Sequence, residues 1–251
     1  MPGDPERVLY TGLTRRTHNS GVPRIGAFVI LLSVAVAAAA HARPAPAAGG
    51  DLLRTLFGAK MVRAEVIVQE GEGVRVLRVD RGRVRALGNR ELRLLERDGT
   101  LLTIPVAPAA SITSHGAQAT FEMLKRGMNV TTVRDAERPA QYVVQPAQAW
   151  PKTLARMLFG QQLVRAEVIL LDGTLRDVRL DHGQIVAVRR RVVRLRESDG
   201  RVVALPVAAN ARITLDGQRA PWSWLRPGMS ATVVRDGEGA AWVVEASAAG
   251  R

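Results

Sequence analysis

Two pairs of carboxylates are the first candidates for chemistry in this sequence. Glu65 and Asp80 recur as Glu167 and Asp181, and two acidic side chains flanking a reacting bond are what glycoside hydrolysis uses. Glu167, however, shares a strand face with Arg165, and Asp181 stands before a glycine in an expected turn. Cross-strand ion pairing and turn hydrogen bonding account for both positions. We therefore predict no catalytic acid.

Cysteine, histidine and serine offer less. The chain has no cysteine, which excludes a thiol nucleophile, a disulfide framework and a thiolate zinc site. His115 and His182 fall in expected turns, without a second ligand at metal spacing. A secreted hydrolase needs a nucleophile and a base, and the nearest approach to such a pair is Ser111 and Ser114 beside His115. We predict a protein that is not an enzyme and has no metal or cofactor.

Arginine is the remaining residue type with chemical potential. Of 36 basic residues only Lys60, Lys125 and Lys152 are lysine, and the formal net charge is +13. One interpretation is a soluble surface with an arginine-rich composition. The other is a basic sheet face that meets an anionic polymer or a membrane surface. The candidate contacts for that second interpretation are Arg83, Arg85, Arg189, Arg190, Arg191 and Arg194.

The sequence that positions these residues contains two copies of one unit. Val62–Ile67 and Val164–Ile169 are identical. Further matches follow at an offset of 101: Asp80-Arg-Gly82 with Asp181-His-Gly183, Asp98-Gly99 with Asp199-Gly200, Gly127-Met128 with Gly228-Met229, and Val133-Arg-Asp135 with Val234-Arg-Asp236. This period suits two small domains that each have a core. We name residues 51–145 copy one and residues 152–251 copy two, with a linker at 146–151.

Each copy shows the pattern of an all-β chain. In copy two, short β-branched runs are separated by glycine-containing steps, which is typical of hairpins. We expect strand breaks at Asp181-His-Gly183 and between Val207 and Arg212. Closure into a small antiparallel β-barrel would remove the exposed strand edges. Trp222 and Trp224 are then either an apolar plug at a barrel end or a stacking platform for a ligand.

The last third of each copy carries a resemblance. Arg212–Gly217, Leu225-Arg-Pro-Gly-Met229 and Ala231–Val234 are similar to a pattern of exported bacterial small β-barrel domains of unknown function. Copy one repeats this pattern in Ser111–Thr113, Gly116, Leu124-Lys-Arg-Gly-Met128 and Val130–Val133. The resemblance implies an oligonucleotide-binding-like barrel outside the cytoplasm, present here in two tandem copies. It supplies no catalytic residues.

The first 42 residues have the three parts of a secretory signal. Arginines in residues 1–24 precede an uncharged apolar run at 25–40, and Ala40-His-Ala42 offers small residues at a cleavage site. We expect cleavage after Ala42, with 43–50 as a flexible linker; the alternatives are an uncleaved N-terminal membrane anchor helix and, least favoured, a cytosolic chain. The run is shorter than the roughly 20 residues of a spanning helix.

The sequence therefore predicts an exported, non-enzymatic binding or structural module of the cell envelope, made of two tandem barrels. The alternative is a polyanion-binding protein that uses its arginine-rich faces on nucleic acid, anionic wall polymer or anionic lipid, although no specific nucleic-acid motif is present. Residues 151–251 hold 16 basic and 10 acidic residues, against 15 and 11 in 51–150. The higher net charge (+6 against +4) and the three adjacent arginines 189–191 at an expected turn therefore make copy two the expected tighter binder.

Overall fold

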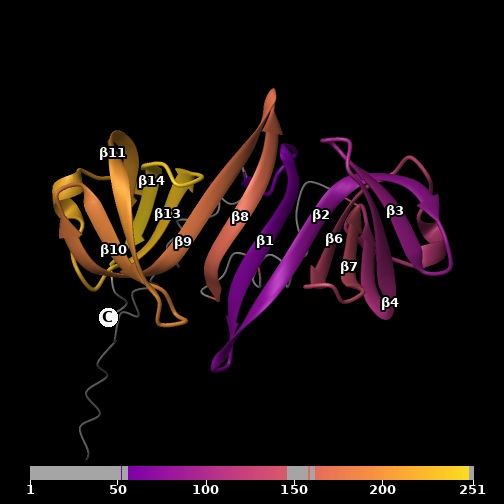
Figure 1. The fold of residues 1–251 in the computed structure, drawn as a ribbon. Coiled ribbons are helices and arrows are strands. Elements are labelled where there is room, and N and C mark those ends of the chain that lie inside the picture. The colour runs from indigo at the N-terminus through magenta and orange to yellow at the C-terminus, as the bar shows by residue number, and fades with distance from the viewer. Residues whose placement is uncertain (1–51, 53–55, 146–157, 159–161, 249–251) are drawn as a thin grey trace, which may run out of the picture. The chain divides into compact units, whose positions relative to one another are not determined.

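β-Strands make up nearly all of the regular structure in the computed structural model, which describes residues 52, 56–145, 158 and 162–248 (Figure 1). The predicted all-β class is confirmed. In copy one the strands are β1 (Met61–Glu70), β2 (Gly73–Leu87), β3 (Glu91–Glu96), β4 (Leu101–Ser114), β5 (Ala117–Ala119), β6 (Asn129–Asp135) and β7 (Ala140–Gln145). In copy two they are β8 (Leu163–Asp172), β9 (Thr174–Arg189), β10 (Val192–Arg196), β11 (Val202–Leu215), β12 (Gln218–Arg219), β13 (Ser230–Asp236) and β14 (Ala241–Ser247).

Two short 3-10 turns complete the described elements, η1 (Phe121–Met123) and η2 (Trp222–Trp224). The expected signal or anchor helix and the linkers at 43–50 and 146–151 lie outside the described residues. Within the described ranges, no helix has the length and apolarity needed to cross a bilayer.

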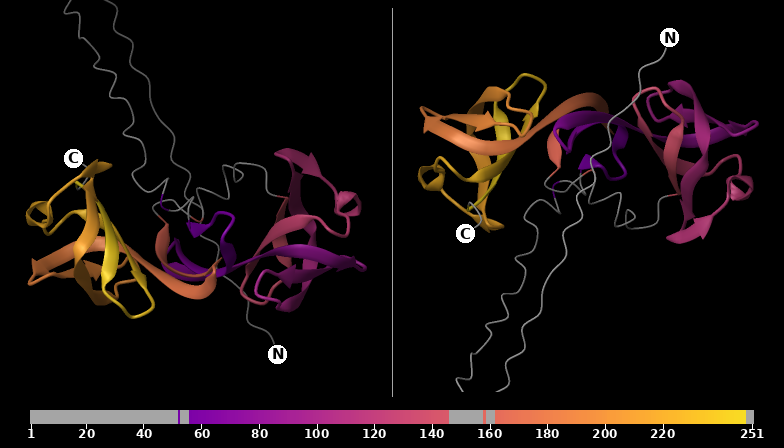
Figure 2. Two further views of the ribbon diagram at one scale, coloured as in Figure 1. Left: turned by 90° about the horizontal axis from the view of Figure 1, so that it is seen from above. Right: turned by 90° about the horizontal axis from the view of Figure 1, so that it is seen from below.

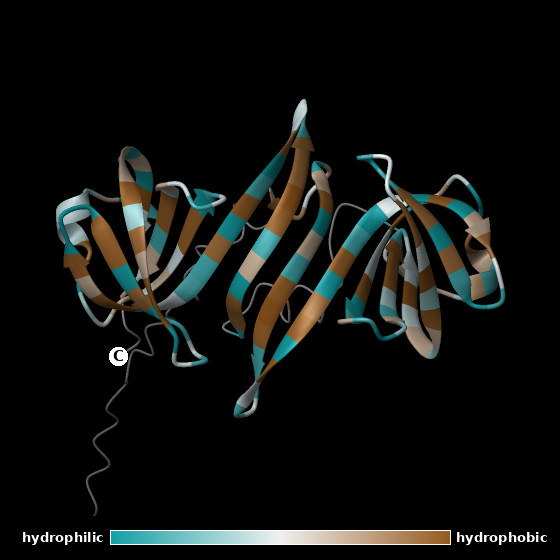
Figure 3. Cartoon of the chain, in the orientation of Figure 1, coloured by the Kyte–Doolittle hydropathy of each residue, from teal (hydrophilic) through white to brown (hydrophobic). Residues whose placement is uncertain are grey.

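In copy one, five strands form a closed ring of hydrogen-bonded pairs. β2 pairs with β3, β3 with β4, β4 with β7, β7 with β6, and β6 returns to β2. Only the β4–β7 pair is parallel. The inward side chains of the ring form an apolar cluster that includes Val84, Leu92, Leu94 and Ile104. Alternate residues of these strands are buried, as in β3, and the hydropathy of the residues alternates along the strands (Figure 3).

Copy two has the same strand order. β9 pairs with β10, β10 with β11, β11 with β14, β14 with β13, and β13 returns to β9. Its interior cluster includes Ile185, Val193, Leu195 and Val233. The curvature of both groups of strands is visible in Figure 2. The two rings thus have the same pairing scheme and a separate apolar interior each.

Both predicted breaks in copy two are wrong. The segment from Asp181 to Gly183 lies inside β9, at the point where β9 exchanges one partner for another: β8 pairs with it as far as Asp181, and β10 pairs with it from Gln184 onward. Gly183 serves close approach instead of a turn, because a Cβ there would lie 2.3 Å from the carbonyl oxygen of Arg196. Likewise, Val207 and Arg212 belong to the single strand β11, which carries a register shift between them.

β1 and β8 lie outside the two rings and pair with each other in antiparallel fashion. A third apolar cluster contains residues of these two strands and of both copies, among them Val66, Leu77, Val168 and Leu180. Every described strand except the short β5 and β12 pairs with at least two neighbours, so these strands have no free edge. The sequence did not predict this joining of the copies.

Candidate functional site

The outer face of β2 carries three arginines at alternate positions. Arg81 is half-buried, whereas Arg83 and Arg85 are exposed. Alternate residues of a regular strand point to the same side and stand about 6.7 Å apart, which describes Arg81 and Arg83; Arg85 lies at a register shift of β2 against β3. Together with Arg97, which follows β3, they line a groove of about 440 Å³. The structure therefore brings four guanidinium groups to one hollow of copy one.

Hydrogen bonds to backbone carbonyl groups fix two of the arginines of this groove. Nη1 of Arg81 donates to the carbonyl oxygen of Gly58 at 2.7 Å, and Nη1 of Arg97 donates to that of Ala59 at 2.6 Å. Gly82 lets β3 approach closely, because a Cβ on it would lie 2.4 Å from the carbonyl oxygen of Leu95. Asn129 completes the rim with an exposed amide. The side chains are thus held in place by backbone groups.

No carboxylate lies within ion-pair distance of these four arginines in the described part of the chain. Burial, followed by the charge of Arg97, lowers the pKa of Arg81. The acidic residue that also lines the groove is Glu96, and Arg63 already occupies its Oε2 at 2.5 Å. The groove consequently concentrates positive charge that no carboxylate of the described residues neutralises.

The corresponding surface of copy two is different. At the repeat offset of 101, the positions of Arg81, Arg83, Arg85 and Arg97 are occupied by His182, Gln184, Val186 and Ser198. One arginine, Arg196, replaces Leu95 and pairs with Gln184 across β9 and β10. Four positive charges in copy one thus correspond to one in copy two, at matched positions on the same strand scheme.

The other predicted arginines lie on the hairpin of β9 and β10. Arg190 and Arg191 form its two-residue turn, with φ values of 49° and 62°. The Arg191 guanidinium lies 5.4 Å from the ring centroid of Trp222 and donates to the carbonyl oxygen of Ala209 at 2.8 Å. Arg191 therefore links the hairpin to η2 through a cation–π contact. Arg189, Arg190 and Arg194 are exposed. The six predicted contacts thus fall into two groups, one in each copy.

Copy one has the same contact between an arginine and an aromatic ring. Arg90 lies 5.7 Å from the ring centroid of Phe121 and donates to the carbonyl oxygen of Pro108 at 2.7 Å. Trp222 packs against the interior cluster of copy two, as expected of a plug, whereas Trp224 is exposed. The sequence signal for this contact between arginine and ring was an arginine and an apolar residue that recur at matching positions of both copies.

Of the two carboxylate pairs, Glu65 and Glu167 are exposed on strands, whereas the aspartates are buried in strands, so the expectation that Asp181 lies in a turn is wrong. Asp80 is 4% and Asp181 5% exposed. Arg134 Nε donates to Asp80 Oδ2 at 3.1 Å, and Arg235 Nε donates to Asp181 Oδ2 at 3.2 Å. Each acid thus has an arginine partner on the neighbouring strand. These pairs account for the repeated aspartates as structural elements.

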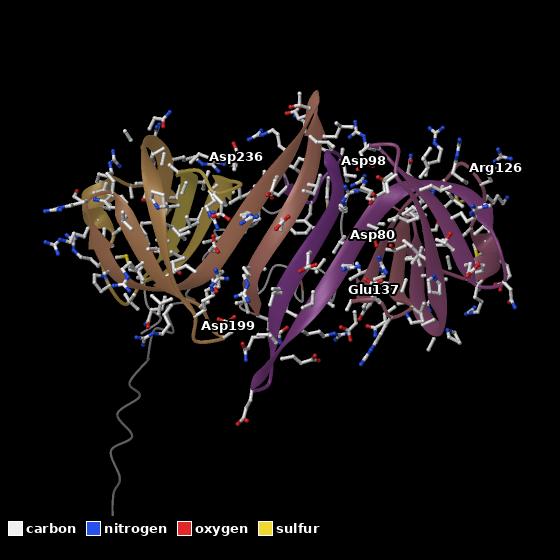
Figure 4. The ribbon with its side chains drawn as sticks, viewed as in Figure 1. Asp80, Asp98, Arg126, Glu137, Asp199 and Asp236 are labelled. Atoms are coloured by element: carbon white, nitrogen blue, oxygen red, sulfur yellow. The ribbon has the colours of Figure 1, made fainter. Side chains whose placement is uncertain are left out.

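Sequence reasoning missed a second pair of buried acids. Glu96 accepts from Arg63, and its counterpart Glu197 accepts from Arg165 at 2.7 Å. The same arginines also bind Asp98 and Asp199 at 2.8 and 2.7 Å. Figure 4 labels Asp80, Asp98 and Asp199 of this duplicated network. The recurrence of each charged residue at the repeat offset was the available signal.

Burial dominates the electrostatics of the network. It raises the pKa of Glu96 to about 7 and also raises that of Glu197, against the opposing effect of their arginine partners. In both residues Oε1 is buried without a hydrogen-bond partner among the described residues. Asp80 and Asp181 add to the rise through their negative charge. The two carboxyls are therefore easier to protonate than exposed glutamates.

The two histidines differ from each other. His115 lies in the turn between β4 and β5, as predicted. His182 lies in β9, where burial lowers its pKa and its Nδ1 is 2.9 Å from Thr232 Oγ1. The described residues contain no group of three histidine, cysteine or acidic side chains that could hold a metal ion.

Comparisons with family models, curated proteins and solved structures found no match to this chain.

Proposed function

We propose that this protein is an exported, non-enzymatic binding or structural module of the cell envelope, built from two oligonucleotide-binding-like β-barrels. The strand order of each ring supports the barrel assignment, because five strands with one parallel pair close on themselves around an apolar interior. The signal-like residues 1–42 support export. The sequence resemblance to exported small β-barrel domains supports both parts of the proposal.

The observation that carries the binding function is the difference between the buried acids, which are ion-paired, and the arginines of the copy-one groove. Asp80, Glu96, Asp181 and Glu197 are buried, and each is ion-paired with an arginine in both copies. Such pairing suits a scaffold, because an unpaired buried charge is strongly destabilising. The groove arginines, in contrast, have no acidic partner among the residues that the structure describes. A partner is therefore expected to bind an outer surface, and the interiors provide rigidity.

The same observation favours polyanion binding over the alternative of a secreted hydrolase. A polyanion needs several guanidinium groups in reach of one chain, which the copy-one groove provides. A hydrolase needs a nucleophile beside a base, and Ser111 and Ser114 stand on β4 while His115 follows in the next turn, in copy one alone. The arginine-rich surface is thus the better supported functional element.

Fractionation of the native host and a retention assay test this proposal. We expect the chain in the extracytoplasmic fraction, with the intact mass of a chain whose first residue is Arg43. If the leader is an anchor, we expect the full-length chain in the membrane fraction. We also expect the purified chain to be retained on isolated envelope material. A cytoplasmic chain, or one that envelope material does not retain, contradicts the proposal.

A further inference from the structure

We propose that the copy-one groove lined by Arg81, Arg83, Arg85 and Arg97 binds one extended phosphodiester chain, and that copy two lacks this site. The inference rests on the proposed binding function and names the ligand class and the copy that holds it. It also reverses the expectation from net charge, because the copy with the lower net charge has the groove.

Charge and geometry together favour phosphate as the bound group. A guanidinium presents a planar fork of N–H donors that matches phosphate oxygens in bidentate fashion. Arg81 and Arg97 each use one Nη1 on a backbone carbonyl, so their remaining donors are held in position before a ligand arrives. Pre-organised donors lose less conformational entropy on binding. An anion would also relieve the repulsion between the two neighbouring guanidinium groups.

The depth of the groove favours a thin chain over a flat or wide partner. Arg81 is half-buried beside Gly82, whereas Arg83 and Arg85 stand exposed farther along β2. A flat bilayer surface can reach the exposed pair but not the recessed guanidinium. An extended chain with one negative charge in each repeat can follow the strand and meet all three in turn. The groove thus selects a single linear polymer.

The lining also indicates which part of a polymer the groove contacts. Apart from the arginines, its lining among the described residues consists of Ala59, Gly82, Leu95, Glu96 and Asn129, without an aromatic ring. Stacking on aromatic rings is the main sequence-tolerant contact of proteins with unpaired bases. A groove without rings therefore contacts the backbone, and nucleic acid and glycerol-phosphate polymers share the chemistry it recognises.

Copy two offers a matched set of residues for the test. The loss variant is Arg83→Gln/Arg85→Val/Arg97→Ser, which installs the residues that copy two has at these positions. The control variant Arg189→Gln/Arg190→Asn/Arg194→Ser removes the same charge from exposed positions of copy two. The gain variant Gln184→Arg/Val186→Arg/Ser198→Arg builds three of the four groove arginines into copy two. Circular dichroism first establishes that each full chain keeps its strand content.

The measurement is the affinity for a short oligothymidylate at several salt concentrations. For single strands the slope of log K against log salt is about −0.7 for each phosphate neutralised, so loss of three arginines makes it shallower by about 2. At about 50 mM salt this corresponds to binding that is weaker by roughly two to three orders of magnitude. We expect the control variant to bind like the natural chain and the gain variant to have a steeper slope.

Further arms identify the source of the phosphodiester. Similar binding of a linear glycerol-phosphate polymer supports recognition of the backbone, and binding of the oligonucleotide alone supports the inference with nucleic acid as the source. An equal loss in the loss and control variants overturns the inference. So does groove-dependent binding to anionic-lipid vesicles without binding to either polymer. A chain that envelope material retains but that binds neither polymer refutes this inference while leaving the proposed function intact.

Discussion

Glu65 on β1 lies directly opposite Glu167 on β8, its own counterpart in the repeat. The register around this pair is reciprocal: Arg63 faces Ile169, and Ile67 faces Arg165. The outer backbone hydrogen bonds are reciprocal as well, since Gln69 N donates to Gln162 O and Leu171 N donates to Lys60 O. The junction therefore has the self-complementary geometry of a two-fold interface, although both strands belong to one chain.

A designed disulfide tests this register. The chain has no cysteine of its own, so Glu65→Cys/Glu167→Cys introduces a single pair of thiols. Directly opposite residues of an antiparallel pair have Cβ atoms about 5 Å apart, close to disulfide range, whereas diagonal neighbours are about 7 to 8 Å apart. We expect mild oxidation to give an intrachain crosslink in the monomer, visible as faster migration in non-reducing electrophoresis.

The matched control is Glu65→Cys/Ile169→Cys, which places the two thiols on a diagonal. It is expected to crosslink far more slowly. Equal crosslinking of both variants, or predominantly interchain dimers, contradicts the register of β1 and β8.

The buried ion pairs stabilise the fold only as complete pairs. Arg134→Ala leaves Asp80 as an uncompensated charge, and this is expected to lower the free energy of unfolding by about 3 to 5 kcal/mol. Arg235→Ala is expected to do the same through Asp181. Urea unfolding followed by circular dichroism measures both changes.

The double variant Arg134→Gln/Asp80→Asn removes both charges and keeps hydrogen-bonding groups. It is expected to be clearly more stable than Arg134→Ala. A single variant as stable as the natural protein contradicts a role of the Arg134–Asp80 pair in stability.

Glu96 predicts the pH dependence of stability. Burial raises its pKa in the folded state to about 7, above the ordinary value of 4.5. The folded protein therefore binds a proton at Glu96 more tightly than the unfolded chain does. The contribution of Glu96 protonation to the free energy of unfolding is fully present below pH 4.5 and is lost as the pH rises to about 7. We expect Glu96→Gln, which imitates the protonated form, to reduce that fall, and Glu197→Gln to act in the same direction in copy two.

Unfolding in urea between about pH 4.5 and pH 8 measures this effect. The substitution Glu91→Gln, at an exposed residue of β3, controls for the loss of one negative charge. A stability profile that is identical for the natural chain and Glu96→Gln over this range refutes the role of Glu96.

The close approach at Gly82 predicts a steric effect on stability. A methyl group would lie 2.4 Å from a carbonyl oxygen of β3, and the backbone must shift to admit it. We expect Gly82→Ala to destabilise the protein by about 1 to 3 kcal/mol, and Gly183→Ala to do so at the matching position of copy two. The control is Gly88→Ala, whose new Cβ would meet Glu91 Cβ at an ordinary 3.6 Å. Equal thermal stability of all three variants contradicts the close approach.

The sequence by itself determined the strand class, the duplication and the main turns. Alternating apolar residues and Asp-Gly steps are local signals, and hairpins such as the one at Asp236-Gly237 depend on local backbone geometry. The repeat also indicated that charged residues shared by both copies have a common structural role. The repeat period also predicts that copy one and copy two each fold alone, and this stays a prediction.

Only the tertiary structure decided the partners of each strand. The Asp-x-Gly segments resemble turns in sequence, yet Gly82 and Gly183 lie where a long strand passes from one neighbour to the next. The groove arises in the same way, because Arg97 meets the arginines of β2 only after β3 has paired beside them. Local periodicity determines which face a side chain occupies. Which strand then lies beside it depends on contacts between distant residues, and no pattern within one strand records them.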